Sequence, residues 1–464
     1  MTLIKSISGI RGTIGGVVKD NLTPLDVVSF ASAYGSWLKE STQKESLVVV
    51  IGRDARLSGD MVSQLVSSSL RGLGIDVVDL GLSTTPTVEH AVLMEEADGG
   101  IILTASHNPK EWNALKLLNH KGEFISAAEG KHILDLAEAA EFQYVEVDAL
   151  GNYTQNDTYL QKHIQHILGL ELVDVEAIKK KNYKVVVDGV NSTGGIFVPE
   201  LLRALGVNRI IELYCEPNGK FPHNPEPLAE NLSKISAVVK EEKADLGIVV
   251  DPDVDRLALV DENGEMFGEE YTLVAVADYV LRHQKGATVS NLSSTRALRD
   301  VTEAAGQQYF ASAVGEVNVV TKMKEVGATI GGEGNGGVIY PTSHYGRDAL
   351  VGIALFLSHL ATLEEGSLST AQLRQTYRDY TISKNKISLT PDIDVDLLLQ
   401  KMEERYKTQP HSTIDGLKIE FDQEWVHLRK SNTEPIIRVY AESESKEKAN
   451  QLAHKIMDEI KSLI

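Results

Sequence analysis

Short runs of aliphatic and β-branched residues alternate with stretches of helical period along most of the chain. The first round contains LVVVI at 47–51, a helical stretch near 60–72, and the apolar runs IDVVDL and GGIIL. Two further rounds begin at YKVVVDG and at ATVSNLSS. Strands that alternate with helices in this way indicate parallel sheets covered by helices. We therefore expect an α/β protein.

Three junctions between a helix and a strand share local sequence. They are SLRGLGIDVVDLG at 69–81, LLRALGVNRIIEL at 201–213 and TKMKEVGATIGG at 321–332. In each, a glycine follows the helix, where it supplies the left-handed cap, and an apolar strand comes next. Any α/β protein contains such junctions, so they leave it open whether the chain is an internal triplication.

The pattern changes in the last part of the chain. KISLTPD, DGLKIEF, EWVHLR and IIRVYAES predict mainly antiparallel strands, and an amphipathic helix follows them. A chain of 464 residues is long enough for about three domains, with two or four also open. The predicted boundaries give the segments 1–152, 153–258, 259–378 and 379–464. The polar segments DALGNYTQND and LEEGSLST are expected to be linkers.

The chain is strongly acidic, with 46 Lys and Arg against 66 Asp and Glu and a formal net charge of −20. This charge argues against binding of duplex nucleic acid or of anionic membranes, so an anionic ligand would need basic residues gathered locally. Cys215 is the only cysteine, so neither an intramolecular disulfide nor a multi-cysteine zinc site is expected. The N-terminus has no long apolar stretch and no run approaches 18 apolar residues, which predicts a cytoplasmic protein without a membrane span.

Three carboxylates follow an apolar strand in the motif DPDVDR. Asp251, Asp253 and Asp255 occupy alternate positions after DLGIVV and can converge on one cation. All-oxygen ligation suits Mg²⁺ or Ca²⁺ rather than zinc. An EF-hand fails as an alternative, because it needs Gly where Arg256 stands and a helix where the strand precedes. A solvated acidic turn is the other alternative, but neighbouring carboxylates repel one another without a cation.

A serine and a histidine follow the strand GGIIL in the motif TASHNP. The carboxyl ends of parallel strands face the ligand crevice. A tight Asn-Pro turn there would present the Ser106 hydroxyl outward with His107 beside it. An ordinary turn and an acyl-transfer serine are the alternatives, and the absence of Gly-x-Ser-x-Gly argues against the second.

Two further loops carry polar groups. GEGNGG at 332–337 formally matches Gly-x-Gly-x-x-Gly, but a strand-like VIYPT follows instead of a helix, which argues against dinucleotide binding. Glu333 and Asn335 in this glycine loop suit sugar hydroxyls or amines. RKSNTEP at 429–435 lies between two predicted strands, and a surface turn is the alternative to a phosphate site there. Its donors, with one on the next strand, suit a phosphate: Arg429, Ser431, Asn432, Thr433 and Arg438.

These four motifs together describe phosphoryl transfer on a sugar phosphate, and the chain resembles the α-D-phosphohexomutase family over essentially its whole length. That family includes phosphoglucomutases, phosphomannomutases and phosphoglucosamine mutases. The resemblance implies three related α/β domains with mixed sheets and a C-terminal α+β domain of TATA-binding-protein-like fold, arranged around a central cleft.

The resemblance also implies roles for the motif residues. Ser106 would be a phosphoserine, and an oxygen of its phosphate would bind Mg²⁺ together with Asp251, Asp253 and Asp255. Lys116 and Arg256 would be the general acid and base. A hexose 1,6-bisphosphate would be both the activator and the intermediate. The sequence alone does not determine the oligomeric state. The other expected contacts are Arg11, Arg53 and His107 at the transferring phosphate, Glu333 and Asn335 at the sugar, and Arg429, Ser431, Asn432, Thr433 and Arg438 at the second phosphate.

Departures from the family pattern bear on the substrate. The common sugar loop is Gly-Glu-x-Ser-Gly-His, and here Asn335 replaces the Ser and Gly337 the His. The basic residues that glucose- and mannose-type members place near Ser293 and Glu316 are missing as well. Glu316 and Glu333 would suit an ammonium group, and these segments resemble the archaeal-type phosphoglucosamine mutases. The expected reaction therefore interconverts glucosamine 6-phosphate and glucosamine 1-phosphate. The alternatives are a phosphoglucomutase or phosphomannomutase, a Mg²⁺-dependent sugar phosphatase, and a non-catalytic sugar-phosphate-binding protein.

Overall fold

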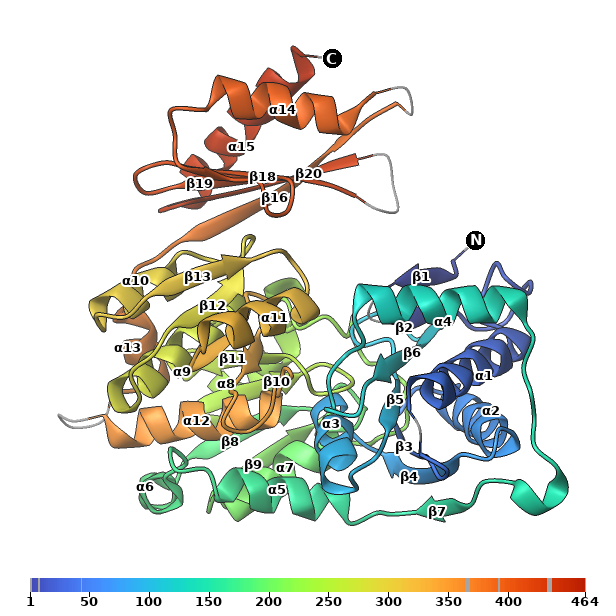
Figure 1. Cartoon of the computed structure of the whole chain (residues 1–464). Helices are drawn as coiled ribbons and strands as arrows, with labels where there is room; N and C mark the ends of the chain where they lie inside the picture. The colour runs from blue at the N-terminus through green and yellow to red at the C-terminus, as the bar shows by residue number, and fades with distance from the viewer. Residues whose placement is uncertain are drawn as a thin grey trace.

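Four sheets follow one another along the chain, three of them in α/β domains and the last in a separate C-terminal domain (Figure 1). The computed structural model describes residues 2–6, 9–42, 44–363, 368–390, 393–431 and 436–463. Every helix within these ranges is too short or too polar to cross a lipid bilayer.

The first sheet is mixed and has the strand order β1-β2-β6-β5-β3-β4-β7. Its strands are β1 Ile4–Ser6, β2 Gly9–Thr13, β3 Val48–Arg53, β4 Asp76–Leu82, β5 Gly99–Leu103, β6 Trp112–Leu118 and β7 Tyr153–Gln155. The associated helices are α1 Pro24–Ser41, α2 Gly59–Gly72, α3 Thr85–Met94, α4 Ala127–Ala139 and the short η1 Val147–Ala149. Side chains alternate along β3. Val49 and Ile51 therefore join the core beneath α1, α2 and α4, while Val50 joins the core beneath α3.

The second and third sheets have the orders β11-β10-β8-β9 and β13-β12-β14-β15. Their strands are β8 Lys184–Asp188, β9 Arg209–Leu213, β10 Leu246–Val250, β11 Leu257–Asp261, β12 Thr288–Asn291, β13 Tyr309–Ser312, β14 Ile330–Glu333 and β15 Gly337–Ile339. Their helices are α5 Tyr159–Leu168, α6 Val175–Lys181, α7 Gly194–Ala204, η2 Ala229–Asn231, α8 Ser233–Glu242, α9 Glu269–His283, α10 Ala297–Ala304, α11 Glu316–Val326, α12 Ala349–Thr362 and α13 Thr370–Gln375. One continuous hydrophobic core extends through both domains.

The three sheets share one topology. A central strand, β3, β8 or β12, has a parallel neighbour on each side, and one of those neighbours pairs antiparallel with the next strand. The predicted relation between the three α/β domains is thereby confirmed. The junction in TKMKEVGATIGG joins a helix to a strand through Gly327 as expected, but it is not the topological counterpart of the other two. The third junction that corresponds in topology joins α10 to β13 through Gly306, at a φ of 69°, whereas TKMKEVGATIGG joins α11 to β14.

The C-terminal domain has a five-stranded antiparallel sheet in the order β16-β20-β19-β18-β17. Helices α14 and α15 pack against this sheet in a core of their own. The elements are β16 Thr381–Ser388, α14 Val395–Arg405, β17 His411–Ser412, β18 Leu417–Glu420, β19 Trp425–Lys430, β20 Ile436–Ser443 and α15 Lys446–Lys461. The mainly antiparallel strands and the final helix expected here are confirmed.

Two strands extend slightly past the predicted domain boundaries. β7 pairs with β4 in the first sheet, and β11 pairs with β10 in the second. The segment DALGNYTQND, expected to be a linker, contributes both η1 and β7. The sheets therefore reach a few residues beyond 152 and 258, and the exact domain limits stay predictions.

Candidate active site

Ser106 lies just beyond β5 with its backbone in the left-handed region, at a φ of 47°. A residue other than glycine adopts this conformation only where surrounding contacts hold it. The Ser106 amide donates to Thr104 Oγ1 at 2.9 Å, and the Ser106 hydroxyl donates to Asp251 Oδ2 at 2.6 Å. His107 Nδ1 lies 3.3 Å from the same hydroxyl oxygen. The turn therefore directs the serine at the carboxylates of the second domain.

Arg56 holds the backbone of this turn, a role that sequence reasoning missed. The side chain is buried, and its Nε pairs with Asp54 Oδ2 at 3.0 Å. A guanidinium has five donors in a fixed plane and can therefore fix several acceptors at once. It donates to the carbonyl oxygens of Ser106 at 2.5 Å, Asn108 at 2.7 Å, Pro109 at 2.7 Å and Trp112 at 2.9 Å.

The three carboxylates after β10 converge. Asp251, Asp253 and Asp255 are fully buried, and one oxygen of each lies within 4.8 Å of the others. Within the described part of the chain, no group hydrogen-bonds to Oδ1 of Asp253 or of Asp255. Buried carboxylate oxygens without donors are unfavourable unless a cation is present. Together with the Ser106 oxygen, this all-oxygen set fits Mg²⁺ or Ca²⁺.

Lys116 on β6 lies against this cluster. Its Nζ is 2.6 Å from Asp253 Oδ2 and 3.4 Å from Asp255 Oδ2. Burial acts to lower the pKa of Lys116, but Asp253 and Asp255 outweigh it and raise that pKa. Lys116 is therefore protonated at neutral pH and can donate a proton. Thr85 at the start of α3 also donates its hydroxyl to Asp253 Oδ2, at 2.6 Å.

Neighbouring groups shift two further pKa values. Burial, then the charges of Asp255 and Asp253, raise the pKa of Asp251 well above its ordinary value. Burial, followed by the positive charge of Arg256, lowers the pKa of His107 to about 3. His107 is therefore neutral at pH 7 and acts as a hydrogen-bonding group rather than as a cation.

Arg347, just before α12, connects the carboxylate cluster to the sugar loop, and sequence reasoning also missed it. Its Nη2 lies 2.7 Å from Asp255 Oδ2, and its Nη1 lies 2.9 Å from Glu333 Oε2. Its Nε is 3.2 Å from Glu316 Oε2, and its amide donates to Glu316 Oε1 at 2.8 Å. One signal was available, because the tetrapeptide GRDA occurs both at 52–55 and at 346–349.

Glu316 and Glu333 are not available as a pair for an ammonium group in this conformation. Arg347 binds both carboxylates, and Oε1 of Glu333 accepts from Asn291 Nδ2 at 2.8 Å and from the Gly315 amide at 3.2 Å. The argument from this acidic pair for an amino sugar therefore loses its structural basis. Asn335 is half-buried, and its Oδ1 accepts from the Gly337 amide at 3.2 Å.

One expected donor of the C-terminal domain, Arg429, is linked to the sugar loop through Asp415. Arg429 on β19 and Arg438 on β20 are directly opposite in the sheet register, a like-charge pair that an anion would relieve. Arg429 Nε lies 2.8 Å from Asp415 Oδ2, which also accepts from the Val314 amide at 3.0 Å. Val314 directly precedes Gly315, which bonds to Glu333. Ser431 lies at the end of β19, whereas Asn432 and Thr433 lie outside the described residues.

The remaining expected cations differ in placement. Arg11 on β2 pairs in register with Ala114, which places it on the same sheet face as Lys116. Its Nε is buried, and no described group hydrogen-bonds to it. Arg256 Nε lies 3.9 Å from Asp255 Oδ1. Arg53 donates to the Asp54 carbonyl oxygen at 3.3 Å, and no described contact brings it to Ser106.

This arrangement can transfer a phosphoryl group. A buried hydroxyl, a cation-binding carboxylate set and a protonated lysine meet where the first two domains touch, and Arg347 adds the third domain. Such positioned charge is the main protein contribution to phosphoryl transfer.

Comparison with known proteins gives matches along the whole chain. Three models, described as phosphoglucomutase/phosphomannomutase α/β/α domains I, II and III, match residues 4–144, 161–264 and 268–380, and a C-terminal domain model matches 390–459. A phosphoglucomutase/phosphomannomutase of Thermococcus kodakarensis is 35% identical over 457 residues, covering 97% of this chain and 98% of its own. A phosphoglucosamine/phosphogalactosamine mutase of Sulfurisphaera tokodaii is 33% identical over 454 residues, covering 96% and 97%. The crystal structure of a phosphoglucomutase/phosphomannomutase family protein from Burkholderia thailandensis superposes with a TM-score of 0.83 at 26% identity, covering 99% of this chain and 98% of that one.

Proposed function

The chain belongs to the phosphoglucomutase/phosphomannomutase family, a family of phosphohexomutases, and on that premise we propose that it interconverts glucosamine 6-phosphate and glucosamine 1-phosphate. The observation that carries the mechanism is the 2.6 Å contact between the Ser106 hydroxyl and Asp251 Oδ2, which joins the first two domains. It puts the nucleophile at the only carboxylate triad among the described residues.

In the proposed first step, phosphorylated Ser106 gives its phosphoryl group to a hydroxyl of the sugar monophosphate. The resemblance implies Arg256 as the base for the proton of that hydroxyl, but a guanidinium stays protonated in proteins. The proton would instead pass to an oxygen of the transferring phosphate, with Arg256 as a charged hydrogen-bond donor. Asp251, Asp253, Asp255 and an oxygen of the serine's phosphate would hold Mg²⁺, which would neutralise charge on the transferring group. Lys116, which is held protonated beside Asp253 and Asp255, would protonate the serine oxygen as it leaves.

The sugar 1,6-bisphosphate would then turn over and return its other phosphate to Ser106. The phosphate not undergoing transfer would bind to Arg429 and Arg438, which are directly opposite in the register of β19 and β20. Arg11 would bind the transferring phosphate, since its buried Nε needs an acceptor. His107, kept neutral by burial, would donate a hydrogen bond beside it.

The choice of glucosamine rests on the loop and on named relatives. Asn335 and Gly337 depart from the usual sugar loop, and a relative that is 33% identical is named for amino-sugar phosphates. A relative named phosphoglucomutase/phosphomannomutase is 35% identical, so glucose and mannose phosphates are the second candidate substrates.

A mutase assay with the Ser106→Ala variant tests the mechanism. With Mg²⁺ and a hexose bisphosphate activator, we expect turnover to fall by at least about 10³-fold, because the group that accepts and donates phosphate is gone. Ser41→Ala, a serine near the end of α1, is the matched control and should keep full activity. Substantial turnover by Ser106→Ala would overturn the phosphoserine mechanism.

The same assay on the unaltered chain tests the substrate. We compare kcat/KM for glucosamine, glucose and mannose phosphates and measure free phosphate in parallel. A preference for glucose or mannose phosphate would remove the glucosamine assignment and keep the mechanism. Accumulation of free phosphate without isomer formation would instead identify a phosphatase.

A further inference from the structure

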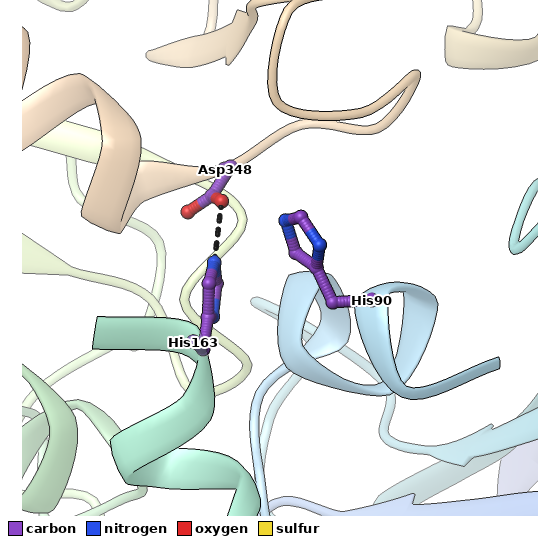
Figure 2. A group of neighbouring side chains, drawn as sticks. All are labelled: His90, His163 and Asp348. Atoms are coloured by element: carbon purple, nitrogen blue, oxygen red, sulfur yellow. Dashed lines mark hydrogen bonds and ion pairs between the residues drawn. The ribbon is translucent and has the colours of Figure 1, made fainter. Parts of the chain in front are cut away.

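Four histidines gather outside the proposed active site, at the junction of the first three domains. His90 lies on α3, His163 and His166 lie on α5, and His344 lies just before α12. The ring centroids of His163, His166 and His344 are 4.5, 4.5 and 4.3 Å from that of His90. Figure 2 shows the rings of His90 and His163 side by side, with His163 pointing to Asp348 at the start of α12.

We propose that His90, His163 and Asp348 bind a transition-metal ion of the Zn²⁺ class, with His344 as the fourth ligand. One ligand atom from each of the first three side chains lies within 4.8 Å of the others, and all three side chains are buried. Imidazole nitrogen with one carboxylate oxygen is a donor set that zinc and similar ions favour, unlike the all-oxygen triad.

The surrounding hydrogen bonds orient two of the histidines as metal ligands. His163 Nδ1 lies 2.8 Å from Thr87 Oγ1, and its Nε2 lies 3.0 Å from Asp348 Oδ2. His344 Nε2 lies 3.2 Å from the same oxygen, while its Nδ1 faces Glu89 Oε2 at 3.2 Å. An outer acceptor on Nδ1 that directs Nε2 toward the ligand site is the arrangement that second-shell groups impose on metal-binding histidines, and here both Nε2 atoms are directed at Asp348 Oδ2.

The two carboxylate oxygens of Asp348 make different contacts. Its Oδ1 caps α12 by accepting from the amides of Leu350 at 2.8 Å and Val351 at 3.1 Å. Its Oδ2 faces the two histidine Nε2 atoms instead. The carboxylate is thus fixed by the helix start, and its second oxygen, which now contacts both histidines, is the one that would bind the ion.

Hydrogen bonds satisfy some groups of this cluster and leave others without an aligned partner. Nε2 of His90 and Nε2 of His166 lie 3.2 and 3.1 Å from the hydroxyl oxygen of Ser343, which can donate to one ring nitrogen and accept from the other. His344 Nδ1 and Glu89 Oε2 are buried, and no described group makes an aligned hydrogen bond to either. A metal on His344 Nε2 would fix the proton on Nδ1, where Glu89 can accept it.

A bound ion would connect the three domains next to the active site. Arg347, which contacts Asp255 and Glu333, directly precedes Asp348. Thr85, which contacts Asp253, lies on the same helix as His90. The ion would therefore fix two elements that position the carboxylate triad, without itself contacting the reacting groups.

The test titrates Zn²⁺ into the chelator-treated chain by calorimetry, with excess Mg²⁺ to occupy the all-oxygen triad. We expect one Zn²⁺ per chain. His90→Ala and His163→Gln should each weaken binding by more than about 100-fold, since even second-shell changes cost roughly 10–100-fold. Asp253→Asn, in the triad, and His120→Ala, at an exposed histidine, should both keep the site.

Two results would overturn the proposal. One is the absence of a Zn²⁺ site in the unaltered chain, and the other is a site lost in Asp253→Asn but kept in both histidine variants. If circular dichroism shows that the histidine variants do not fold, the same Zn²⁺ titration of Thr87→Val tests the proposal instead. It removes the outer partner of His163, together with the hydrogen bond between Thr84 and Thr87, and should weaken binding about 10–100-fold, so an unchanged affinity would reject the site.

Discussion

Lys418 on β18 is a buried cation in the C-terminal domain. Its ammonium lies 4.3 Å from the ring centroid of Trp425 and 3.9 Å from Glu420 Oε1. Burial lowers the pKa of Lys418 to about 8, which means that the nearby carboxylates do not fully compensate for lost solvation.

This pKa predicts how stability depends on pH. Between pH 8 and about 10.4, the lysine value in an unfolded chain, the unfolded state binds more protons than the folded state. The free energy of unfolding contributed by Lys418 therefore rises with pH across this window, by up to about 3 kcal/mol. Lys418→Met should be more stable than the unaltered chain at pH 7, and this advantage should shrink toward pH 10.4.

Urea unfolding at several pH values checks this prediction. Lys455→Met, at an exposed lysine on α15, is the control. Its free energy of unfolding should vary with pH in the same way as that of the unaltered chain. A constant difference between Lys418→Met and the unaltered chain from pH 7 to 10 would contradict the prediction.

Residues in short contiguous motifs could be predicted, and residues that act through tertiary contacts could not. Asp251, Asp253 and Asp255 stand beside a strand end, and local sequence suffices to bring them together. Arg347 gains its importance from Asp255 and Glu333, which are distant in sequence, so the repeated GRDA tetrapeptide marks its position but not its contacts. The same contact removed Glu333 from the predicted acidic pair.

At the scale of elements, the loop between β14 and β15 is set by close backbone contact. Gly336 has a φ of 86°, and a Cβ there would lie 2.4 Å from the Leu257 carbonyl oxygen. The Leu257 amide in turn donates to the Gly336 carbonyl oxygen at 3.0 Å. Leu257 directly follows the DPDVDR motif. The contact between Leu257 and Gly336 therefore fixes the sugar loop relative to the loop that carries the three carboxylates.

Gly336→Ala should disturb both loops. The left-handed backbone costs about 1–2 kcal/mol for alanine, and the clash with Leu257 adds roughly 1–3 kcal/mol. Gly306→Ala is the matched control, because its φ of 69° is similar but no described atom lies within 4 Å of a Cβ there. We expect a larger loss in the free energy of unfolding and a higher KM in Gly336→Ala than in the control. Equal losses in the two variants would show that the contact with Leu257 is unimportant.

The elements were predictable to different degrees. Long apolar runs such as those forming β3 and β10 stand out because both sheet faces are buried. β7 and β15 have only three residues each, and they form because a neighbouring strand is already in place. Their short sequences carry no such signal. The likeness of TKMKEVGATIGG to the other two junctions, without a shared place in the topology, has a similar cause, since every helix end that uses a glycine cap looks alike.

At the scale of the whole molecule, the anionic chain gathers its cations at the site. Lys116, Arg347 and Arg256 come from three different domains and all approach Asp255. This placement meets the condition that an anionic ligand imposes on a chain with a net charge of −20. Composition predicts that a cluster of cations is needed, but which lysines and arginines form it depends on how the domains pack.

The C-terminal domain is joined to the third domain mainly through polar contacts, while its hydrophobic core is separate. Glu442 Oε1 accepts from the Arg296 amide at 3.0 Å and from Trp425 Nε1 at 2.7 Å. Ser293 Oγ lies 2.9 Å from His427 Nδ1, at the position where a lysine was expected in other family members. Polar interfaces of this kind permit domain motion, which turnover of a bisphosphate between two phosphate sites would require.

Glu442→Ala should loosen this docking. It leaves the Arg296 amide and the Trp425 indole without their acceptor, at a cost of about 1–3 kcal/mol for each buried donor. We expect a larger radius of gyration by small-angle X-ray scattering and a several-fold higher KM for the sugar phosphate, because Arg429 and Arg438 would be held less firmly near the sugar loop. Glu444→Ala, at an exposed glutamate paired with Lys448, is the control and should change neither quantity. If Glu442→Ala raised KM while the radius of gyration stayed at the control value, Glu442 would act on the site locally and docking would not limit substrate binding.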